Sequence, residues 1–541
     1  MSTVADAVGA ALAGLGVGHA FGVVGSGNFH VTNALRAHGV PFTAARHECG
    51  AATMADAYAR TSGEVAVLTL HQGCGLTNAL TGITEAAKSR TPLLVLAADT
   101  AGSAVRSNFR VDQDALVAAV GAVPERVHSA ASAVADLARA YDTCRGLRRT
   151  VVLSLPLDVQ AAHGEPGPAR FAARPPARPG AAAAARLAAL VDAAERPVFL
   201  AGRGARAAGP EVAALADTCG ALLATSAVAN GLFSGHDWNL GICGGFATDL
   251  AAELIAAADL VVAWGASLTM WTTRHGALLG DGATVVQVDD TPAAIGAQRH
   301  VDLGVLGDVA ETARDVAALV AGGPGYRTDA VGVRIATEGR WAQVPVPPQT
   351  PDPARIDPRT LSAALDALLP PARTVAVDSG NFMGYPSAYL AVPDAAGFCF
   401  TQGFQSIGLG LATAIGAALA RPDRLPVAAV GDGGFLMGVS ELETVVRLGI
   451  GMLIVVYDDA GYGAEFHHFT GADHGCVRFP DTDLAALAAG YGCAAATVRQ
   501  VSDLDVVRGW LGGPRDRPML VDAKVRSDEP SWWLQEAFRG H

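Results

Sequence analysis

The sequence lacks the features that mark secreted, membrane-spanning and nucleic-acid-binding proteins. Its eight cysteines are scattered without a Cys-x-x-Cys pair, so neither a zinc knuckle nor a disulfide framework is indicated. No run of about 18 apolar residues is long enough to span a bilayer, and no Lys or Arg precedes Arg36 to start a signal peptide. The formal net charge of −13 works against binding to nucleic acid or an anionic membrane. These absences predict a cytoplasmic protein that acts on small molecules.

The chain of 541 residues is too long for one ordinary core, and two Pro-rich stretches interrupt it. They run from Glu165 to Gly180 and from Val344 to Pro358, and repeated proline there excludes both helix and central strand. Read as linkers, they predict three domains, at residues 1–165, 181–343 and 359–541.

Short apolar runs alternate with Ala- and Leu-rich helical segments throughout the chain. The runs include EVAVLTL, PLLVLAA and RTVVLSL in the first predicted domain and RPVFLAG, DLVVAWG and TVVQV in the second. Continuous apolar runs separated by helices are typical of parallel strands buried on both faces. We therefore predict an α/β protein with three doubly wound parallel sheets, whose ligands bind at the carboxyl ends of the strands.

One βαβ unit in the third predicted domain brings two aspartates together. The run LPVAAV ends in Gly431-Asp432-Gly433-Gly434, a helical segment follows with Ser440 as its capping candidate, and MLIVVY ends in Asp458-Asp459. A right-handed crossover brings the two strand ends to one edge, where Asp432 and Asp459 can offer oxygens to one hard cation. Because glycine lets backbone amides approach an anion, the unit predicts a metal-bridged diphosphate. The alternative is an ordinary Gly-Asp turn after a strand.

This unit resembles the signature of the thiamine diphosphate enzyme superfamily, in which GDG is followed about 25 to 30 residues later by an Asn-rich strand end. The resemblance implies that Asp432, Asp459 and the Gly461 carbonyl bind Mg²⁺ and that Tyr462 lies against the diphosphate. This chain departs from the family in having Asp458-Asp459 where Asn-Asn is usual. An added carboxylate strengthens cation binding but repels the diphosphate, so the sign of the net effect stays open.

The stretch AARHECGAATMADAYAR predicts an Ala-rich helix that begins at Glu48. It resembles the RHE…GA…MADGYAR pattern of acetolactate synthases, and this implies that Glu48 hydrogen-bonds N1′ of the cofactor and promotes loss of its C2 proton. By itself, a Glu in a first helical turn interacts favourably with the helix dipole. The family builds each site from this segment of one subunit and the third domain of another, which implies at least a homodimer and leaves a tetramer open.

Further cofactor contacts are implied by the same resemblance. In TQGFQSIGLGLATAIGAALARP, Ile407 matches the bulky residue that bends the cofactor and the Gln405 carbonyl matches the acceptor of its 4′-amino group. Gly380, Asn381 and Phe382 match a diphosphate-side loop. An Ile at a helix start is otherwise a core residue. The middle domain has FLAGRGARAAG but not the full GxGxxG fingerprint, so FAD stays undecided and a structural role is favoured.

Three residues bear on the choice of reaction. His71, in HQGCG, and Ser26, in VVGSGN, resemble in position the active-site histidine and serine of benzoylformate decarboxylase. Glu465 falls six residues beyond Asp459, where pyruvate decarboxylases carry a glutamate. A histidine relays protons near neutral pH. The alternatives are a histidine satisfied at a strand end and a glutamate facing solvent.

The resemblance therefore predicts a thiamine diphosphate-dependent decarboxylase or carboligase of 2-oxo acids, similar to acetolactate synthase. In that chemistry a C2 ylid adds to the 2-oxo acid, carbon dioxide leaves, and the enamine is protonated or joined to a second carbonyl. Two alternatives are a carbon–carbon lyase or hydrolase of an acyloin or diketone, and a catalytically silent cofactor-binding subunit. The donor and acceptor substrates stay open.

Overall fold

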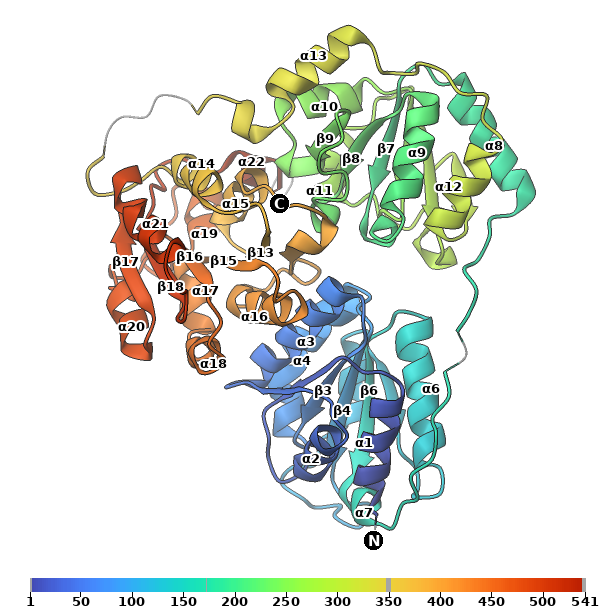
Figure 1. The fold of residues 1–541 in the computed structure, drawn as a ribbon, viewed down its shortest axis with the longest axis vertical. Coiled ribbons are helices and arrows are strands. Elements are labelled where there is room, and N and C mark those ends of the chain that lie inside the picture. The colour runs from blue at the N-terminus through green and yellow to red at the C-terminus, as the bar shows by residue number, and fades with distance from the viewer. Residues whose placement is uncertain (1, 172, 347–351, 538–541) are drawn as a thin grey trace.

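The computed structural model describes residues 2–171, 173–346 and 352–537. Figure 1 shows three lobes, and each contains one six-stranded sheet. The paired strands of all three sheets run parallel. The predicted α/β class with three parallel sheets is confirmed. Of the two predicted linkers, residue 172 and residues 347–351 lie outside the described residues.

The first lobe contains a sheet with the order β2-β1-β3-β4-β6-β5. Its strands are β1 (His19–Gly22), β2 (Phe42–Ala44), β3 (Ala66–Leu70), β4 (Leu93–Asp99), β5 (Val123–Arg126) and β6 (Val151–Pro156). Its helices are α1 (Val4–Gly14), α2 (Phe29–Ala37), α3 (Glu48–Ser62), α4 (Cys74–Lys88), α5 (Gln113–Ala119), α6 (Ala133–Gly146) and α7 (Leu157–Ala161). The predicted helix start at Glu48 is confirmed.

The third lobe repeats this strand order, as β14-β13-β15-β16-β18-β17. Its strands are β13 (Arg373–Val377), β14 (Phe398–Phe400), β15 (Leu425–Gly431), β16 (Leu453–Asp458), β17 (Ala494–Val498) and β18 (Met519–Lys524). Its helices are α14 (Pro358–Leu368), α15 (Gly384–Tyr389), α16 (Gly410–Ala420), α17 (Asp432–Met437), α18 (Glu441–Arg447), α19 (Gly463–His468), α20 (Leu484–Tyr491), α21 (Asp505–Leu511) and α22 (Trp532–Ala537). Pro358, the last residue of the second predicted linker, is instead the first residue of α14, a position where its missing N–H costs nothing.

The second lobe has the different order β12-β11-β10-β7-β8-β9. Its strands are β7 (Pro197–Ala201), β8 (Leu222–Thr225), β9 (Asn239–Ile242), β10 (Leu260–Trp264), β11 (Thr284–Asp289) and β12 (Leu303–Leu306). Its helices are α8 (Ala181–Ala193), α9 (Gly209–Cys219), α10 (Asp249–Ala256), α11 (Met270–Thr273), α12 (Val309–Ala317) and α13 (Asp329–Glu338). Numbered within the lobe, this is the doubly wound order 3-2-1-4-5-6 read from the other edge.

The central strands of each sheet consist of the apolar runs seen in the sequence. Every residue of β3, β7, β10 and β16 is buried. Strands that are covered on both faces gain burial from every side chain rather than from alternate ones, and this explains why these runs are continuous.

The first and third lobes share one hydrophobic core. It includes Met54 from α3, Leu76 from α4 and Ile415 from α16, all fully buried. The helices α3 and α16 approach so closely that a Cβ on Gly416 would lie 2.1 Å from the Met54 carbonyl oxygen. Only glycine fits this contact, so the pairing of these two helices depends on it.

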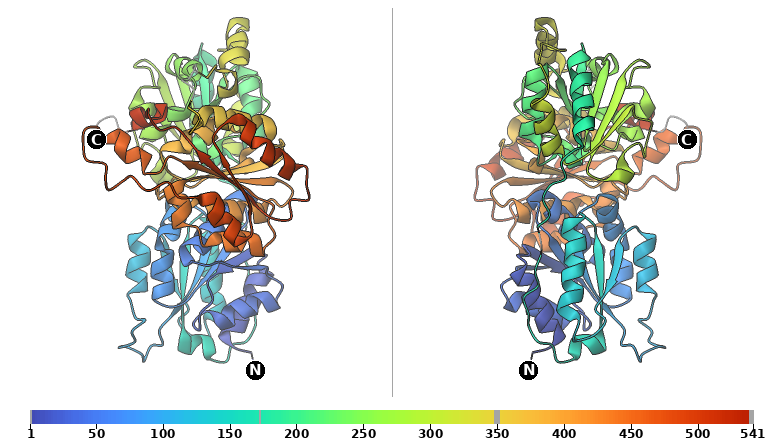
Figure 2. Two further views of the ribbon diagram at one scale, coloured as in Figure 1. Left: turned by 90° about the vertical axis from the view of Figure 1, so that its left-hand side faces the viewer. Right: turned by 90° about the vertical axis from the view of Figure 1, so that its right-hand side faces the viewer.

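The second lobe docks against the other two through its glycine-rich turn. Arg206, in GRGARAAG, donates to the carbonyl oxygens of Arg60 (2.9 Å) and Ala395 (2.7 Å), and Arg203 donates to that of Ser89. On the side facing the third lobe, Phe246 packs edge-on against Trp533 with ring centroids 6.0 Å apart. Figure 2 shows the third lobe between the other two in side view. The turn thus holds the three lobes together, in line with a structural role.

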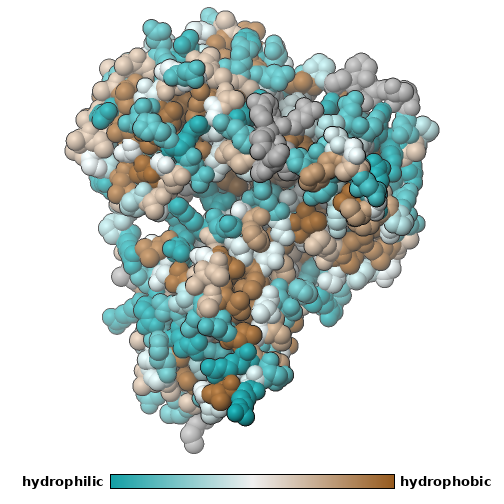
Figure 3. All heavy atoms as spheres, turned by 180° about the vertical axis from the view of Figure 1, so that it is seen from behind, coloured by the Kyte–Doolittle hydropathy of each residue, from teal (hydrophilic) through white to brown (hydrophobic). Residues whose placement is uncertain are grey.

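In the parts of the chain that the structure describes, no helix is both long and apolar enough to cross a bilayer. Figure 3 shows polar and apolar side chains intermixed over the rear face.

Candidate functional site

A cavity of about 290 Å³ opens at the carboxyl ends of the strands of the third sheet. The predicted cofactor, metal and substrate residues of the third lobe line it, with the exception of Gln405. These lining residues are Gly380, Asn381, Phe382, Ile407, Gly431, Asp432, Gly433, Gly434, Asp459, Gly461, Tyr462 and Glu465. Residues separated by up to 85 positions therefore meet at one edge of the sheet, as the parallel topology requires.

Two carboxylates line this cavity: Asp432 is buried, and Asp459 is half-buried. Burial, the negative charge of Asp459 and that of Asp458 raise the pKa of Asp432 to about 8. Burial, opposed in part by a hydrogen bond from Ser527, raises the pKa of Asp459 to about 6. Two like charges held together out of water favour a bound cation, because it repays the cost of ionising both.

The donor set fits a hard divalent cation that also binds a phosphate ligand. Within the described residues, no group of three or more His, Cys, Asp or Glu side chains is placed to hold a metal ion. A magnesium-type ion needs only one or two carboxylates and completes its octahedral shell with carbonyl, phosphate and water oxygens. The two carboxylates, the adjacent Gly461 backbone and the glycine-lined wall supply that combination.

The two adjacent aspartates have different surroundings. Asp458 is not among the residues that line the cavity; its Oδ2 pairs with Lys524 Nζ at 2.6 Å, and its Oδ1 accepts the Ala460 N–H at 2.9 Å. Lys524 is itself buried and also contacts Asp481 (2.6 Å) and Asp522 (3.1 Å). Removing one partner of a buried ion pair costs about 3–5 kcal/mol. The departure from Asn-Asn therefore adds one carboxylate to the cavity, at Asp459, and one behind it, at Asp458, which shares Lys524 with two further aspartates.

The loops beside the aspartates are held by specific contacts. Asn381 Oδ1 accepts the Ser531 hydroxyl at 2.8 Å, and Phe382 stacks on Tyr457 with ring centroids 5.2 Å apart. Between Asp459 and Gly461, Ala460 adopts a left-handed conformation with φ of 57°. A non-glycine residue in this region is strained and persists only where its surroundings hold it, and such residues cluster at functional sites.

The loop before α16 depends on a carboxylate that sequence reasoning missed. Asp378, fully buried just after β13, accepts the N–H groups of Gly408 at 2.9 Å and Leu409 at 3.2 Å. Burial, only partly offset by these hydrogen bonds, raises its pKa to about 6. Its position directly after an apolar run is the sequence feature that could have identified Asp378 as a site residue. Gln405, outside the cavity lining, has a left-handed φ of 64°.

The first lobe gathers its own predicted residues at the equivalent edge. Ser26 Oγ lies 3.3 Å from His71 Nε2, and His71 Nδ1 lies 2.9 Å from the Gln72 carbonyl oxygen. Because a carbonyl only accepts, this contact favours the tautomer with the proton on Nδ1, which leaves Nε2 to accept from Ser26. A Cβ on Gly75 would lie 3.2 Å from His71 Cβ and 3.8 Å from Glu48 Oε1, so the three predicted side chains are neighbours.

Glu48 is positioned from both sides. Its half-buried carboxylate accepts Asn78 Nδ2 at 3.0 Å. Just before it, the N–H groups of Arg46 and His47 each donate to Glu441 Oε1 at 3.0 Å. Glu441, 2% exposed, comes from the third lobe, so a residue almost 400 positions away fixes the start of α3.

The sequence-based prediction that Ser440 caps α18 is wrong. Ser440 occupies the N-cap position, but its side chain makes no capping hydrogen bond and its backbone is already helical. The neighbouring Glu441 instead reaches across the interface and approaches within 2.5 Å of a Cβ built on Gly50, which explains the glycine there. A carboxylate that accepts backbone N–H groups has no partner side chain to reveal it in the sequence.

The structure separates the predicted residues into two groups. As far as the chain is described, all residues that line the cavity belong to the third lobe, while Ser26, His71 and Glu48 lie at the edge of the first sheet. Glu465, in α19, lines the cavity and is also exposed, so both interpretations of it remain compatible with its place.

In comparison with known proteins, three models of one family match successive parts of the chain. A model described as Thiamine pyrophosphate enzyme, N-terminal TPP binding domain, matches residues 2–118. The models of the central domain and of the C-terminal TPP binding domain of the same family match residues 184–316 and 378–523. Thiamine pyrophosphate is another name for thiamine diphosphate.

Individual relatives are similar over most of their length. A probable 2-ketoarginine decarboxylase of Pseudomonas aeruginosa is 31% identical, over 91% of this chain and 88% of that protein. A sulfoacetaldehyde acetyltransferase of Rhodobacter capsulatus is 30% identical, over 84% of this chain and 82% of that protein. A putative acetolactate synthase large subunit of Mycobacterium tuberculosis is 29% identical, over 85% and 86%. With three matched domains in their family order, this chain belongs to the thiamine pyrophosphate enzyme family.

Proposed function

We propose that this protein uses thiamine diphosphate and Mg²⁺ to decarboxylate a 2-oxo acid and to join its acyl group to a second carbonyl compound, as acetolactate synthases do. The observation that carries the proposal is the pair Asp432, which is buried, and Asp459, which is half-buried, on a glycine-lined cavity that suits a cation bridged to a diphosphate. The relatives named as a decarboxylase and an acetolactate synthase subunit support the reaction class.

The residues divide the work between binding and proton transfer. When bound, thiamine diphosphate supplies the electron sink for breaking the carbon–carbon bond. Asp432, Asp459 and the Gly461 carbonyl would hold Mg²⁺, while the glycines of 431–434 let the backbone approach the diphosphate. Glu48 would exchange a proton with the aminopyrimidine of the cofactor.

His71 and Ser26 would handle the substrate proton. In the tautomer favoured by the Gln72 carbonyl, His71 Nε2 can take a proton from Ser26 or from a substrate hydroxyl. Both side chains are at the open edge of the first sheet, where a small carbonyl compound can reach them.

We further propose that the working site needs a second copy of the chain. None of the described residues that line the cavity comes from the first lobe, although Glu48 is required for activation under the proposed function. A two-fold dimer would place the first-lobe edge of one subunit over the third-lobe cavity of the other, with two identical sites. The same arrangement repeats in a tetramer built from such dimers.

The direct test is turnover. With added thiamine diphosphate and Mg²⁺, pyruvate and longer 2-oxo acids are expected to release carbon dioxide and give acetolactate or another acyloin, measured by gas release and by chromatography of the products. Absence of turnover for every 2-oxo acid tried, together with absence of cofactor binding, contradicts the proposal.

A hybrid experiment tests the shared site. Glu48→Gln and Asp432→Asn chains, each inactive as a homodimer, are co-expressed with different tags and purified through both. Each hybrid dimer has one site with both residues intact, so it is expected to show about half the wild-type activity per dimer. Inactive hybrids would place both residues in a site formed within one chain.

A second candidate follows from the similarity to sulfoacetaldehyde acetyltransferase. Its name gives an aldehyde, not a 2-oxo acid, as the acyl donor. Transfer of an acetyl group from this two-carbon aldehyde keeps its carbon–carbon bond and breaks its carbon–sulfur bond with release of sulfite, so the same activation by Glu48 can serve a donor that releases no carbon dioxide. Testing sulfoacetaldehyde, with sulfite release as the readout, and simple acyloins, with release of an aldehyde, distinguishes the candidates, because turnover of either substrate gives product without carbon dioxide.

A further inference from the structure

The segment 401–409 connects β14 to α16 and carries Gln405 and Ile407, the two residues expected to contact the aminopyrimidine ring. Ile407 lines the cavity, and Gln405 has a left-handed φ of 64°. The segment has no helix or strand of its own, so few backbone hydrogen bonds within it oppose a change of conformation. A strained loop of this kind keeps its shape only through contacts with its surroundings.

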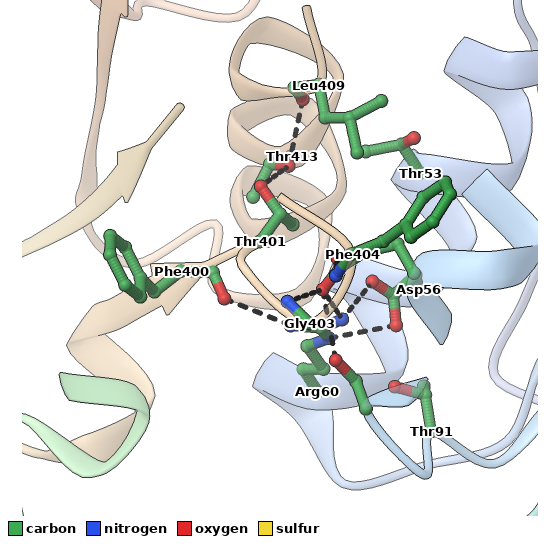
Figure 4. A network of polar contacts seen from close by, with 12 residues as sticks. Thr53, Asp56, Arg60, Thr91, Phe400, Thr401, Gly403, Phe404, Leu409 and Thr413 are labelled. Carbon is green, nitrogen blue, oxygen red and sulfur yellow. Dashed lines mark hydrogen bonds and ion pairs between the residues drawn. The ribbon is translucent and has the colours of Figure 1, made fainter. Parts of the chain in front are cut away.

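The first end of the segment is held by a carboxylate from the first lobe. Glu85, fully buried in α4, accepts the N–H of Gly403 at 3.0 Å through Oε1 and that of Phe404 at 2.6 Å through Oε2. Arg60 pairs with Glu85 at 2.7 Å and with Asp56 at 2.6 Å. Figure 4 shows Arg60, Asp56, Gly403 and Phe404 converging at this point.

The second end is held by a carboxylate from the third lobe. Asp378 Oδ2 accepts the Gly408 N–H at 2.9 Å, and Oδ1 accepts the N–H groups of Leu409 at 3.2 Å and Ser379 at 2.9 Å. Both carboxylates therefore bind two consecutive backbone amides of the segment, one pair on each side of residues 405–407. Hydrogen bonds to an ionised acceptor are roughly twice as strong as neutral ones, so each pair restrains the backbone firmly.

The positive charge of Arg60 helps to keep the Glu85 carboxylate ionised. Burial raises the pKa of Glu85, but the positive charge of Arg60 and the two N–H groups outweigh it and leave the pKa below its usual value. Arg60 in turn donates to the Phe400 carbonyl oxygen at 3.1 Å, one residue before the segment. The segment is thus tied to α3 and α4 as well as to its own sheet.

We propose that Glu85 and Asp378 are positioning residues that hold Gln405 and Ile407 in the conformation that accepts the aminopyrimidine ring. This inference rests on the proposed function. Neither carboxylate lines the cavity, so each acts through the backbone that it binds. Because Glu85 belongs to the first lobe, docking of that lobe controls a cofactor contact made by the third.

The test compares Glu85→Gln and Asp378→Asn with the control Asp56→Asn in the full-length protein. Asp56 is equally buried and pairs with the same Arg60, but in the described part of the chain it accepts no hydrogen bond from residues 401–409. An amide can accept from only one of the two N–H groups and turns its NH₂ toward the other. Two quantities are measured: hydrogen–deuterium exchange of peptides covering 401–411 without cofactor, and the dissociation constant of thiamine diphosphate with Mg²⁺, by tryptophan fluorescence.

Both variants are expected to exchange the 401–411 amides faster than wild type and to bind the cofactor about tenfold more weakly, the loss expected for one or two charge-assisted hydrogen bonds. Asp56→Asn is expected to lower thermal stability while leaving exchange of the segment and cofactor affinity near wild type. Asp378 has no ion pair among the described residues, so Asp378→Asn decides the test alone if Glu85→Gln does not fold.

The outcomes separate this inference from the proposed function. Wild-type protein that binds no thiamine diphosphate contradicts the function, and the inference with it. Wild-type protein that binds the cofactor, with both variants binding it as tightly as Asp56→Asn, contradicts the inference alone. Equal exchange of the segment in all four proteins also overturns it.

Discussion

The first and third sheets have the same strand order but place different chemistry at their carboxyl ends. After the first strand of each sheet come Ser26 and Asp378, and after the second come Glu48 and the segment 401–409. After the third come His71 and Asp432. The first-lobe edge is partly open to solvent and carries Ser26, Glu48 and His71, side chains of types that can exchange protons, whereas the third-lobe edge lines a cavity with the carboxylates of Asp432 and Asp459. Topology thus fixes where polar residues gather, and the residues after each strand determine the chemistry available at that edge: under the proposed function, the first-lobe edge transfers protons and the third-lobe edge holds a cation.

The largest expected effect tests the proton-transfer side of this comparison. Glu48→Gln keeps the size of the side chain and its acceptor for Asn78, but removes the exchangeable carboxyl proton. We expect kcat to fall about a thousandfold, within the range for loss of a general acid–base group, with cofactor affinity close to wild type. Steady-state assays and fluorescence titration measure the two quantities. A variant with wild-type kcat contradicts the role assigned to Glu48.

A smaller effect is expected from Glu441, which links the two edges. Glu441→Gln weakens the hydrogen bonds to the Arg46 and His47 N–H groups and so loosens the turn that carries Glu48. We expect kcat to fall about tenfold, the equivalent of one charge-assisted hydrogen bond. The matched control is Glu443→Gln, two positions along the same helix, which removes a partly exposed pair with Arg46. Equal losses in both variants would contradict the positioning role.

His71 is expected to matter less for activation and more for the fate of the substrate. His71→Ala removes the acceptor for Ser26 and the proton relay at the open edge. We expect kcat to fall several-fold to about tenfold, and the ratio of aldehyde to acyloin products to change, because protonation and addition compete at that point. Gas chromatography of the products measures the ratio of aldehyde to acyloin. An unchanged ratio at unchanged rate would identify His71 as a strand-end residue without a catalytic part.

The smallest expected effect is a pH dependence of thermal stability that comes from the carboxylates of the third-lobe edge. A carboxyl whose pKa is raised on folding favours the folded state when protonated, so its contribution is complete below the unfolded-state pKa and is lost as pH rises through the folded-state pKa. With the pKa of Asp432 at about 8, we expect the thermal midpoint of cofactor-free protein to fall by a few degrees between about pH 5 and pH 8.

The variant Asp459→Asn tests the cause of this pH dependence. It removes the largest like-charge cause of the raised Asp432 pKa, so the fall in thermal midpoint is expected to flatten. Mg²⁺ with thiamine diphosphate is expected to restore stability most at the higher pH, where a larger fraction of the wild-type carboxylates is ionised. Differential scanning fluorimetry across pH measures both effects. An identical pH slope in wild type and variant would show that the two carboxylates do not interact.

Much of this arrangement could be read from local sequence. The apolar runs predicted parallel strands, and the spacing of Gly431-Asp432 and Asp459 predicted two carboxylates at one edge. The different surroundings of Asp458 and Asp459 could not be predicted from local sequence. Neighbouring residues at a strand end point to opposite sides, but which one faces the cavity depends on where Lys524 lies in the next strand.

The sequence by itself determined the α/β class, the start of α3 at Glu48 and the residues gathered at each strand end, because periodicity and turn chemistry are local properties. The tertiary structure alone decided that Glu441 holds the turn before Glu48 and that Glu85 and Asp378 hold the segment 401–409. The physical reason is that these carboxylates bind backbone N–H groups, which every residue except proline carries. No pattern of side chains marks such partners, and only the folded chain brings them within hydrogen-bonding distance.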